Sequence, residues 1–160
     1  MNYKCYLAVA AAVLATACSR ETPPAETAAT KPPIEAPPPV TELQKIDVIK
    51  GTGEGISLGQ QAVVHYTGWL YEPGQPDNKG KQFDSSRERG KPFRFTIGAG
   101  GVIKGWEEGV QGMQPGVQRQ LVIPASLGYG ESGAGQGVIP PNATLLFDIE
   151  LLAIEDAPSP

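Results

Sequence analysis

The sequence predicts an α+β fold in which an antiparallel β-sheet wraps around one short α-helix. Four segments rich in branched and aromatic residues are bounded by glycine or proline turns, which is typical of strands: residues 61–66, 93–97, 119–123 and 145–152. One face of the last segment is wholly apolar and carries Leu145, Phe147, Ile149 and Leu151. Only residues 105–113 have helical spacing, with Trp106, Val110 and Met113 four and three positions apart. Strands around a single helix imply that the concave face of the sheet covers it.

Length and charge limit the possible functions. The chain has 160 residues, enough for one domain, and its net charge of −4 argues against a general nucleic-acid binder. Basic residues gather between Lys79 and Arg94, but no aromatic ladder accompanies them, so we interpret this segment as a solvated loop. The two cysteines, Cys5 and Cys18, precede the predicted domain, and His65 is the single histidine. We therefore expect no metal site.

Residues 1–17 have the pattern of a signal peptide. A positively charged end precedes a short apolar stretch, and residues 15–17 have the small-x-small pattern of a cleavage site. Cys18 follows, and this junction resembles the lipobox of bacterial lipoproteins, in which the thiol is acylated. Leu14 lies one position further from Cys18 than the usual leucine, so secretion with a free thiol stays open as the alternative. With Ser19 next, we expect a periplasmic protein of the cell envelope, anchored to the outer membrane.

Residues 18–42 begin with Cys18 and continue as a low-complexity linker. Seven of the 16 prolines lie between Pro23 and Pro39, among alanine, threonine and glutamate, so we expect a disordered, extended segment. At about 3.1 Å per residue, it reaches roughly 70 Å at most. We interpret it as a tether between a membrane and a folded domain at residues 43–155, with residues 156–160 as a short tail.

Familiar catalytic and cofactor motifs are missing from the sequence. A serine hydrolase could use only His65, which lies within a predicted strand, and no Gly-x-Ser-x-Gly segment is present. Residues 74–82 imitate a phosphate loop, but Gln82 stands where serine or threonine must hold magnesium. Residues 98–101 lack the third glycine of a dinucleotide fingerprint. We therefore expect no cofactor, and we interpret His65 as structural.

Four sequence blocks follow one another along the domain: VVHYTG at 63–68, FDSSR at 83–87, VIKGWEEG at 102–109 and PPNATLLFDIELL at 140–152. Together they resemble the FKBP family, the macrolide-binding peptidyl-prolyl cis/trans isomerases, over nearly all of residues 43–155. The resemblance implies the FKBP architecture in detail. It also implies X-Pro-containing polypeptides as substrates and macrolides as inhibitors.

Aromatic and branched side chains can support this reaction without a nucleophile. The peptide C–N bond resists rotation because resonance gives a barrier of roughly 18–20 kcal/mol. A twisted amide loses that resonance and has a less polar carbonyl, so an apolar pocket that excludes water should bind it better than water does. Differential binding of this kind is itself catalysis.

The resemblance implies roles for individual residues. It places Trp106 at the floor of the proline pocket, Val138 at its rim, and along its walls Tyr66, Phe83, Phe93, Val102, Ile103, Tyr129, Ile139 and Phe147. The backbone N–H of Ile103 and the hydroxyl of Tyr129 match donors to substrate or macrolide carbonyl groups. Asp84 matches the carboxylate at the pocket wall, held by Tyr66 and Arg89. The residues implied to be catalytic are Tyr66, Asp84, Ile103, Trp106, Tyr129 and Phe147.

The chain departs from the family pattern in its loops. It carries an insertion between Gly68 and Phe83, which we expect to leave the pocket unchanged, and residues 130–137 are rich in glycine. We find no second small domain before Phe147 and no long amphipathic helix before residue 43, so we expect a monomer. Two other classes stay open: a non-catalytic or chaperone module that binds proline-containing peptides, and a structural envelope lipoprotein. An isomerisation assay with and without a macrolide distinguishes them.

Overall fold

The computed structural model describes residues 40–156. The predicted signal peptide, Cys18, nearly all of the linker and residues 157–160 of the tail lie outside this range. Within it, the strands and the α-helix are β1 (Gln44–Ile49), β2 (Gln60–Tyr71), β3 (Lys79–Ser85), β4 (Phe93–Thr96), α1 (Lys104–Val110), β5 (Gln118–Ile123) and β6 (Leu145–Asp156). Short 3-10 helices are η1 (Pro76–Asn78), η2 (Ala125–Leu127), η3 (Gly130–Ser132) and η4 (Gly135–Gly137).

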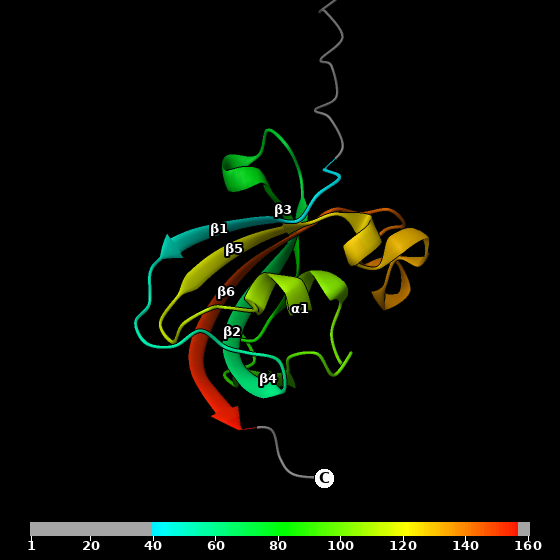
Figure 1. Cartoon of the computed structure of the whole chain (residues 1–160). Helices are drawn as coiled ribbons and strands as arrows, with labels where there is room; N and C mark the ends of the chain where they lie inside the picture. Colours follow the sequence, from blue (N-terminus) through cyan, green and yellow to red (C-terminus); the bar gives the residue numbers. More distant parts are fainter. Residues whose placement is uncertain (1–39, 157–160) are drawn as a thin grey trace, which may run out of the picture. The chain divides into compact units, whose positions relative to one another are not determined.

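The strands form one antiparallel sheet in the order β1-β5-β6-β2-β3, and β4 pairs with the beginning of β2. β2 pairs with β6 from Gln60 opposite Asp156 to Leu70 opposite Leu145. Figure 1 shows the sheet curving around α1, which lies against its concave face. The predicted fold class, an antiparallel sheet wrapped around one short helix, is therefore confirmed.

The core lies between the sheet and α1. The β6 side chains that were predicted to share an apolar face are all buried there: Leu145, Phe147, Ile149 and Leu151. Gly105 and Gly109 allow α1 to lie close to β5, because a Cβ at either position would overlap the side chain of Ile123 or Leu121, respectively. The spacing of four residues puts both glycines on the helix face that meets the sheet.

The strand predictions were incomplete. β6 continues beyond the predicted end at residue 152 because its last residues stay paired with the beginning of β2. β2 likewise extends to Tyr71, where residue 66 was the predicted end. β1 and β3 were not predicted as strands. Every residue of β1 is exposed, and β3 has no buried apolar residue, so neither contributes a buried apolar side chain to the core.

The helix is shorter than predicted. It ends at Val110 rather than Met113, because Gln111 has extended dihedral angles and Gly112 has a positive φ of 78°. Met113 lies beyond the helix but is fully buried, so its apolar side chain belongs to the core.

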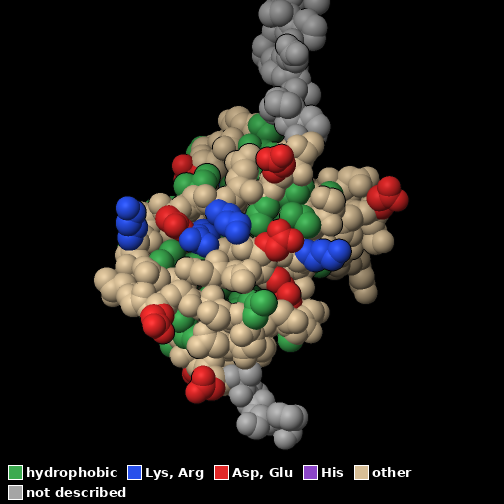
Figure 2. Space-filling model, in the orientation of Figure 1, with side chains coloured by type: hydrophobic (Ala, Val, Ile, Leu, Met, Phe, Trp, Pro, Cys, Tyr) green, Lys and Arg blue, Asp and Glu red, His purple; other side chains and the backbone are tan. Residues whose placement is uncertain are grey.

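Charge is spread over the face of the molecule seen in Figure 2. Figure 2 shows Lys and Arg side chains interspersed with Asp and Glu on the visible face, without a large patch of either sign. Between residues 40 and 156, no helix combines the length and the apolar character needed to cross a bilayer. The same residues contain no cluster of His, Cys, Asp and Glu side chains that could hold a metal ion.

Candidate active site

Four aromatic rings from three strands pack around the indole of Trp106 on α1. The distances between the Trp106 ring centroid and those of its neighbours are 4.9 Å to Tyr66, 5.2 Å to Phe147, 5.5 Å to Phe95 and 5.9 Å to Phe93. Three of the four contacts are edge-to-face, the geometry that aromatic quadrupoles favour. The indole N–H is buried and has no acceptor among the described residues. Ring packing, rather than a hydrogen bond, therefore holds the indole in place.

A cavity of ≈ 170 Å³ borders these rings. Its lining comes from β2, β3, β4, α1, β6 and the loops between them, and consists of Tyr66, Phe83, Asp84, Phe93, Gly101, Val102, Ile103, Trp106, Tyr129 and Phe147. All of these except Gly101 were named from the sequence. Asp84 is the one charged residue in the lining, so the walls are largely apolar.

Gly68 on β2 makes room for two of the rings. A Cβ at this position would lie 2.7 Å from ring atoms of both Phe147 and Phe83. β2 lies between β6 and β3 in the sheet, so the two rings must meet across it. They do so edge-to-face with centroids 5.5 Å apart. Glycine at residue 68 is therefore a steric requirement of this cavity wall.

The carboxylate of Asp84 is held by two protein partners. The hydroxyl of Tyr66 donates a hydrogen bond to Oδ2, and the guanidinium of Arg89 donates one to Oδ1. Arg89 also donates to the hydroxyl of Tyr66 at 2.8 Å, and its guanidinium carbon lies 5.5 Å from the centroid of the Tyr66 ring. Both carboxylate oxygens are thus engaged in charge-assisted hydrogen bonds, which fixes a negative charge at the cavity wall.

The two tyrosines of the site are donors across the neutral range. Burial raises the pKa of Tyr66, and its hydrogen bond to Asp84 raises it further, against an opposing effect of Arg89. Burial also raises the pKa of Tyr129, with an additional contribution from the charge of Asp84. Because an unperturbed tyrosine titrates only near pH 10, both hydroxyls keep their protons at physiological pH.

Two hydrogen-bond donors of the lining are unoccupied by the described part of the chain. Ile103 directly precedes α1, where the first backbone N–H groups have no intrahelical acceptor, and its own N–H has no partner within residues 40–156. Its carbonyl accepts a hydrogen bond from the N–H of Trp106 at 2.9 Å. The hydroxyl of Tyr129, whose residue is 39% exposed, likewise makes no hydrogen bond there. These groups could bind the carbonyl oxygens of a ligand.

Comparison with known families identifies the domain that contains this cavity. The family of FKBP-type peptidyl-prolyl cis-trans isomerases matches residues 52–152, which include every residue of the lining. The chain belongs to this family. It is a peptidyl-prolyl cis-trans isomerase, and the resemblance carried by the four sequence blocks is confirmed.

Similar proteins span most of the isomerase. An FK506-binding protein of Neisseria meningitidis serogroup B is 49% identical over 108 residues, which are 68% of this chain and 92% of the relative. An FK506-binding protein of Streptomyces anulatus is 43% identical over 126 residues, 78% of this chain and 97% of the relative. The crystal structure of FkpA from Escherichia coli matches with a TM-score of 0.63 and 42% identity, over 74% of this chain and 50% of that one. The crystal structure of AtFKBP13 matches with a TM-score of 0.60 and 43% identity, over 69% of this chain and 91% of that one.

Three predicted binding residues of the isomerase lie outside the cavity lining. Arg89 does not line the cavity, but it donates hydrogen bonds to two lining residues, Asp84 and Tyr66. Val138 is 40% exposed. Ile139 is buried in the core, and it forms a bridge with Ala134, each backbone N–H donating to the other residue's carbonyl at 3.0 Å.

The histidine and the loop insertion contribute no residue to the isomerase cavity. His65 Nδ1 lies 3.0 Å from the hydroxyl of Ser86, and that hydroxyl accepts a hydrogen bond from the backbone N–H of Tyr66 at 2.8 Å. His65 therefore contacts Ser86, which holds the backbone of Tyr66, and does not line the cavity itself. Gly101 was missed by sequence reasoning because a residue without a side chain carries no chemical signal of its own.

Proposed function

We propose that the isomerase accelerates rotation of X-Pro bonds by binding the twisted amide in the cavity above Trp106 more tightly than the planar amide. The observation that carries this proposal is the composition of the cavity wall. It is formed by aromatic and branched residues around Trp106, and its one charge, on Asp84, is already engaged by Tyr66 and Arg89. A less polar, twisted carbonyl loses less on leaving water for such a wall than a planar one does, so the barrier falls.

The free donors orient the substrate. The backbone N–H of Ile103 and the hydroxyl of Tyr129 bind carbonyl oxygens beside the proline, and the edges of Phe147, Trp106 and Tyr66 surround the proline ring. No general acid or base takes part, since the hydroxyls of the lining are held protonated by a raised pKa. The test is acceleration of cis/trans exchange in short X-Pro peptides by the full-length chain.

A macrolide such as FK506 occupies the same cavity and inhibits the isomerase. Support comes from the relatives, which are named FK506-binding proteins, and from the overlap of their matched regions with the cavity lining. The free N–H of Ile103 and hydroxyl of Tyr129 supply donors for macrolide carbonyl groups. Competition between FK506 and an X-Pro peptide for the protein would test shared occupancy.

The isomerase acts as a monomer on polypeptides of the cell envelope, held at the outer membrane by a lipid on Cys18. The location and the anchor are supported by the sequence of residues 1–19, which lie outside the described range. The proline-rich linker would then set the distance between the membrane and the cavity. Fractionation of cells that express the full-length chain tests the location.

A further inference from the structure

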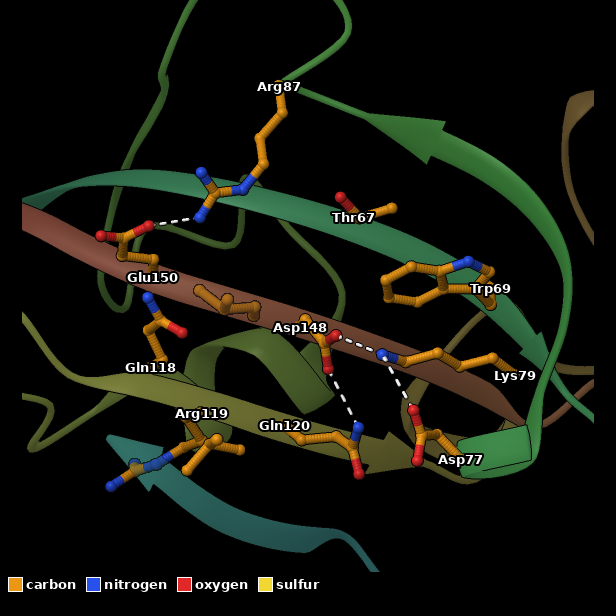
Figure 3. A pocket seen from close by; sticks show the side chains of 12 residues that line it. Thr67, Trp69, Asp77, Lys79, Arg87, Gln118, Arg119, Gln120, Asp148 and Glu150 are labelled. Atoms are coloured by element: carbon orange, nitrogen blue, oxygen red, sulfur yellow. Dashed lines mark hydrogen bonds and ion pairs between the residues drawn. The ribbon is translucent and has the colours of Figure 1, made fainter. Parts of the chain in front are cut away.

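A second cavity lies on the outer face of the sheet, away from the core. Its volume is ≈ 440 Å³, against ≈ 170 Å³ for the proline pocket, and lies within the range of roughly 300–1,000 Å³ that is usual for ligand sites. Cross-strand pairing aligns polar residues here: Gln118 opposite Glu150, and Gln120 opposite Asp148, which in turn lies opposite Thr67. Figure 3 shows these side chains around a shallow hollow, which we call the outer-face bowl.

The charges of the outer-face bowl are paired, with one acid in surplus. Lys79 pairs with Asp148 at 2.7 Å and lies 4.0 Å from Asp77, and Arg87 pairs with Glu150. Arg119 also borders the bowl, but its side chain pairs with Asp47 at 2.5 Å and donates to the carbonyl of Gly109 on α1, so its charge is directed to the helix side of the sheet. Without surplus positive charge, the bowl gives no electrostatic attraction to nucleic acid or to an anionic membrane. Its ligand is therefore not a polyanion.

The glutamines of the bowl can both donate and accept hydrogen bonds. The side-chain amide of Gln118 has no hydrogen bond among the described residues. Gln120 uses one N–H on Asp148, at 3.0 Å, which leaves its carbonyl oxygen available. Such paired donor and acceptor groups match the N–H and C=O of a peptide unit.

Apolar groups extend the bowl toward the edge of the sheet. Val48 on β1 belongs to the lining and is 65% exposed. Ile46, 47% exposed, lies on the same face, because it is paired with Gln120. At the other end, the indole of Trp69 borders the bowl with Lys79 Nζ 4.5 Å from its centroid. Amide groups beside exposed branched side chains suit an extended polypeptide better than an oligosaccharide, which has no branched apolar groups to bury.

We propose that the outer-face bowl is a second binding site for unfolded polypeptide, which holds a stretch of substrate chain remote from the X-Pro bond in the proline pocket. The proposal rests on the isomerase acting on polypeptides. Tyr66 and Thr67 are neighbours on β2 and point to opposite faces of the sheet, so the two sites lie back to back. A long chain that contacts both sites gains from effective concentration, whereas a tetrapeptide fills only the proline pocket.

The test compares two substrates of the full-length chain: a short X-Pro tetrapeptide and an unfolded protein whose refolding is limited by X-Pro isomerisation. The variant Val48→Asp/Gln118→Ala removes an apolar and an amide contact from the bowl. Leu58→Asp is the control, because Leu58 is 68% exposed and lies outside the bowl. We expect the variant to raise KM for the unfolded protein at least about threefold, with unchanged kcat/KM for the tetrapeptide and no effect of the control.

A binding measurement separates the bowl from the isomerase reaction. A proline-free unfolded polypeptide is titrated into the FK506-saturated chain, and we expect binding that the variant weakens. Equal KM values and equal binding for wild type and variant, each with an unchanged thermal midpoint, would overturn the proposal. Binding of a neutral oligosaccharide such as maltoheptaose, without binding of polypeptide, would also overturn it. A wild type that is inactive on tetrapeptides yet binds the proline-free chain would contradict the proposed function and leave the bowl supported.

Discussion

The hydroxyl of Tyr66 on β2 donates a hydrogen bond to the carboxylate of Asp84 on β3, and Arg89 bonds to both. These hydrogen bonds hold Asp84, the only charged residue of the cavity lining, in a fixed position. The carboxylate can therefore shape the electric field across the cavity from a fixed position.

Asp84→Val tests whether this field matters. Valine has a similar size but removes the charge and leaves Tyr66 and Arg89 without their shared partner. We expect kcat/KM for an X-Pro peptide to fall by about tenfold or more, which corresponds to about 1.4 kcal/mol of lost transition-state binding. The thermal midpoint, measured on the same samples, should show that the fold survives. Full activity in a folded Asp84→Val protein would mean that the carboxylate is structural.

The dependence of activity on pH should be nearly flat from about pH 6 to pH 9, because the proposed mechanism uses no general acid or base. The folded-state pKa values of Tyr66 and Tyr129 are raised. Their contribution to the free energy of unfolding is therefore fully present below the ordinary tyrosine value of about 10 and is lost as the pH rises through the raised values. His65→Gln should leave the rate profile unchanged. A bell-shaped profile that disappeared in this variant would assign the histidine a catalytic role.

Gly109→Ala should destabilise the protein although alanine is the better helix former. The gain in helix propensity is about 1 kcal/mol, while the new Cβ would overlap the side chain of Leu121, and overpacking costs roughly 1–3 kcal/mol. We expect a lower thermal midpoint. Glu108→Ala, at an exposed position of the same helix, is the control and should change the midpoint little. A higher midpoint for Gly109→Ala would show that α1 can move away from β5 at no cost.

Cys18→Ala in the full-length chain should release the isomerase from membranes, since the acylated thiol is the proposed anchor. Cys5→Ala should change nothing, because Cys5 lies within the predicted signal peptide. Membrane fractionation and mass spectrometry of the mature amino terminus check both variants. Retention of a correctly processed Cys18→Ala protein on membranes would contradict the tether.

Strands were predicted from the sequence most readily where their apolar side chains are buried. β6 was recognised because Leu145, Phe147, Ile149 and Leu151 all face the core, whereas β1 is short and has every residue exposed. Helical spacing correctly found Trp106 and Val110, but continued to Met113 because apolar spacing does not register the turn at Gly112.

Most residues of the cavity around Trp106 could be predicted because they lie in sequence blocks that resemble a family. Ile139 shows the limit, since a position directly before a block does not determine whether a side chain enters the cavity or the core. The outer-face bowl was not predicted. Gln118, Glu150 and Thr67 are ordinary polar surface residues along the sequence, and only the register of three strands brings them together.

The most direct measurement is the rate of X-Pro cis/trans exchange with the full-length wild type and with Trp106→Leu, each with and without FK506. We expect the wild type to accelerate exchange, which otherwise takes tens of seconds or more, and FK506 to abolish the effect. Trp106→Leu should lose about tenfold or more of kcat/KM and some stability, because the indole contacts four rings and its loss leaves a cavity. A folded wild type without activity on several X-Pro peptides, or a folded Trp106→Leu with unchanged activity, would contradict catalysis by the aromatic cavity.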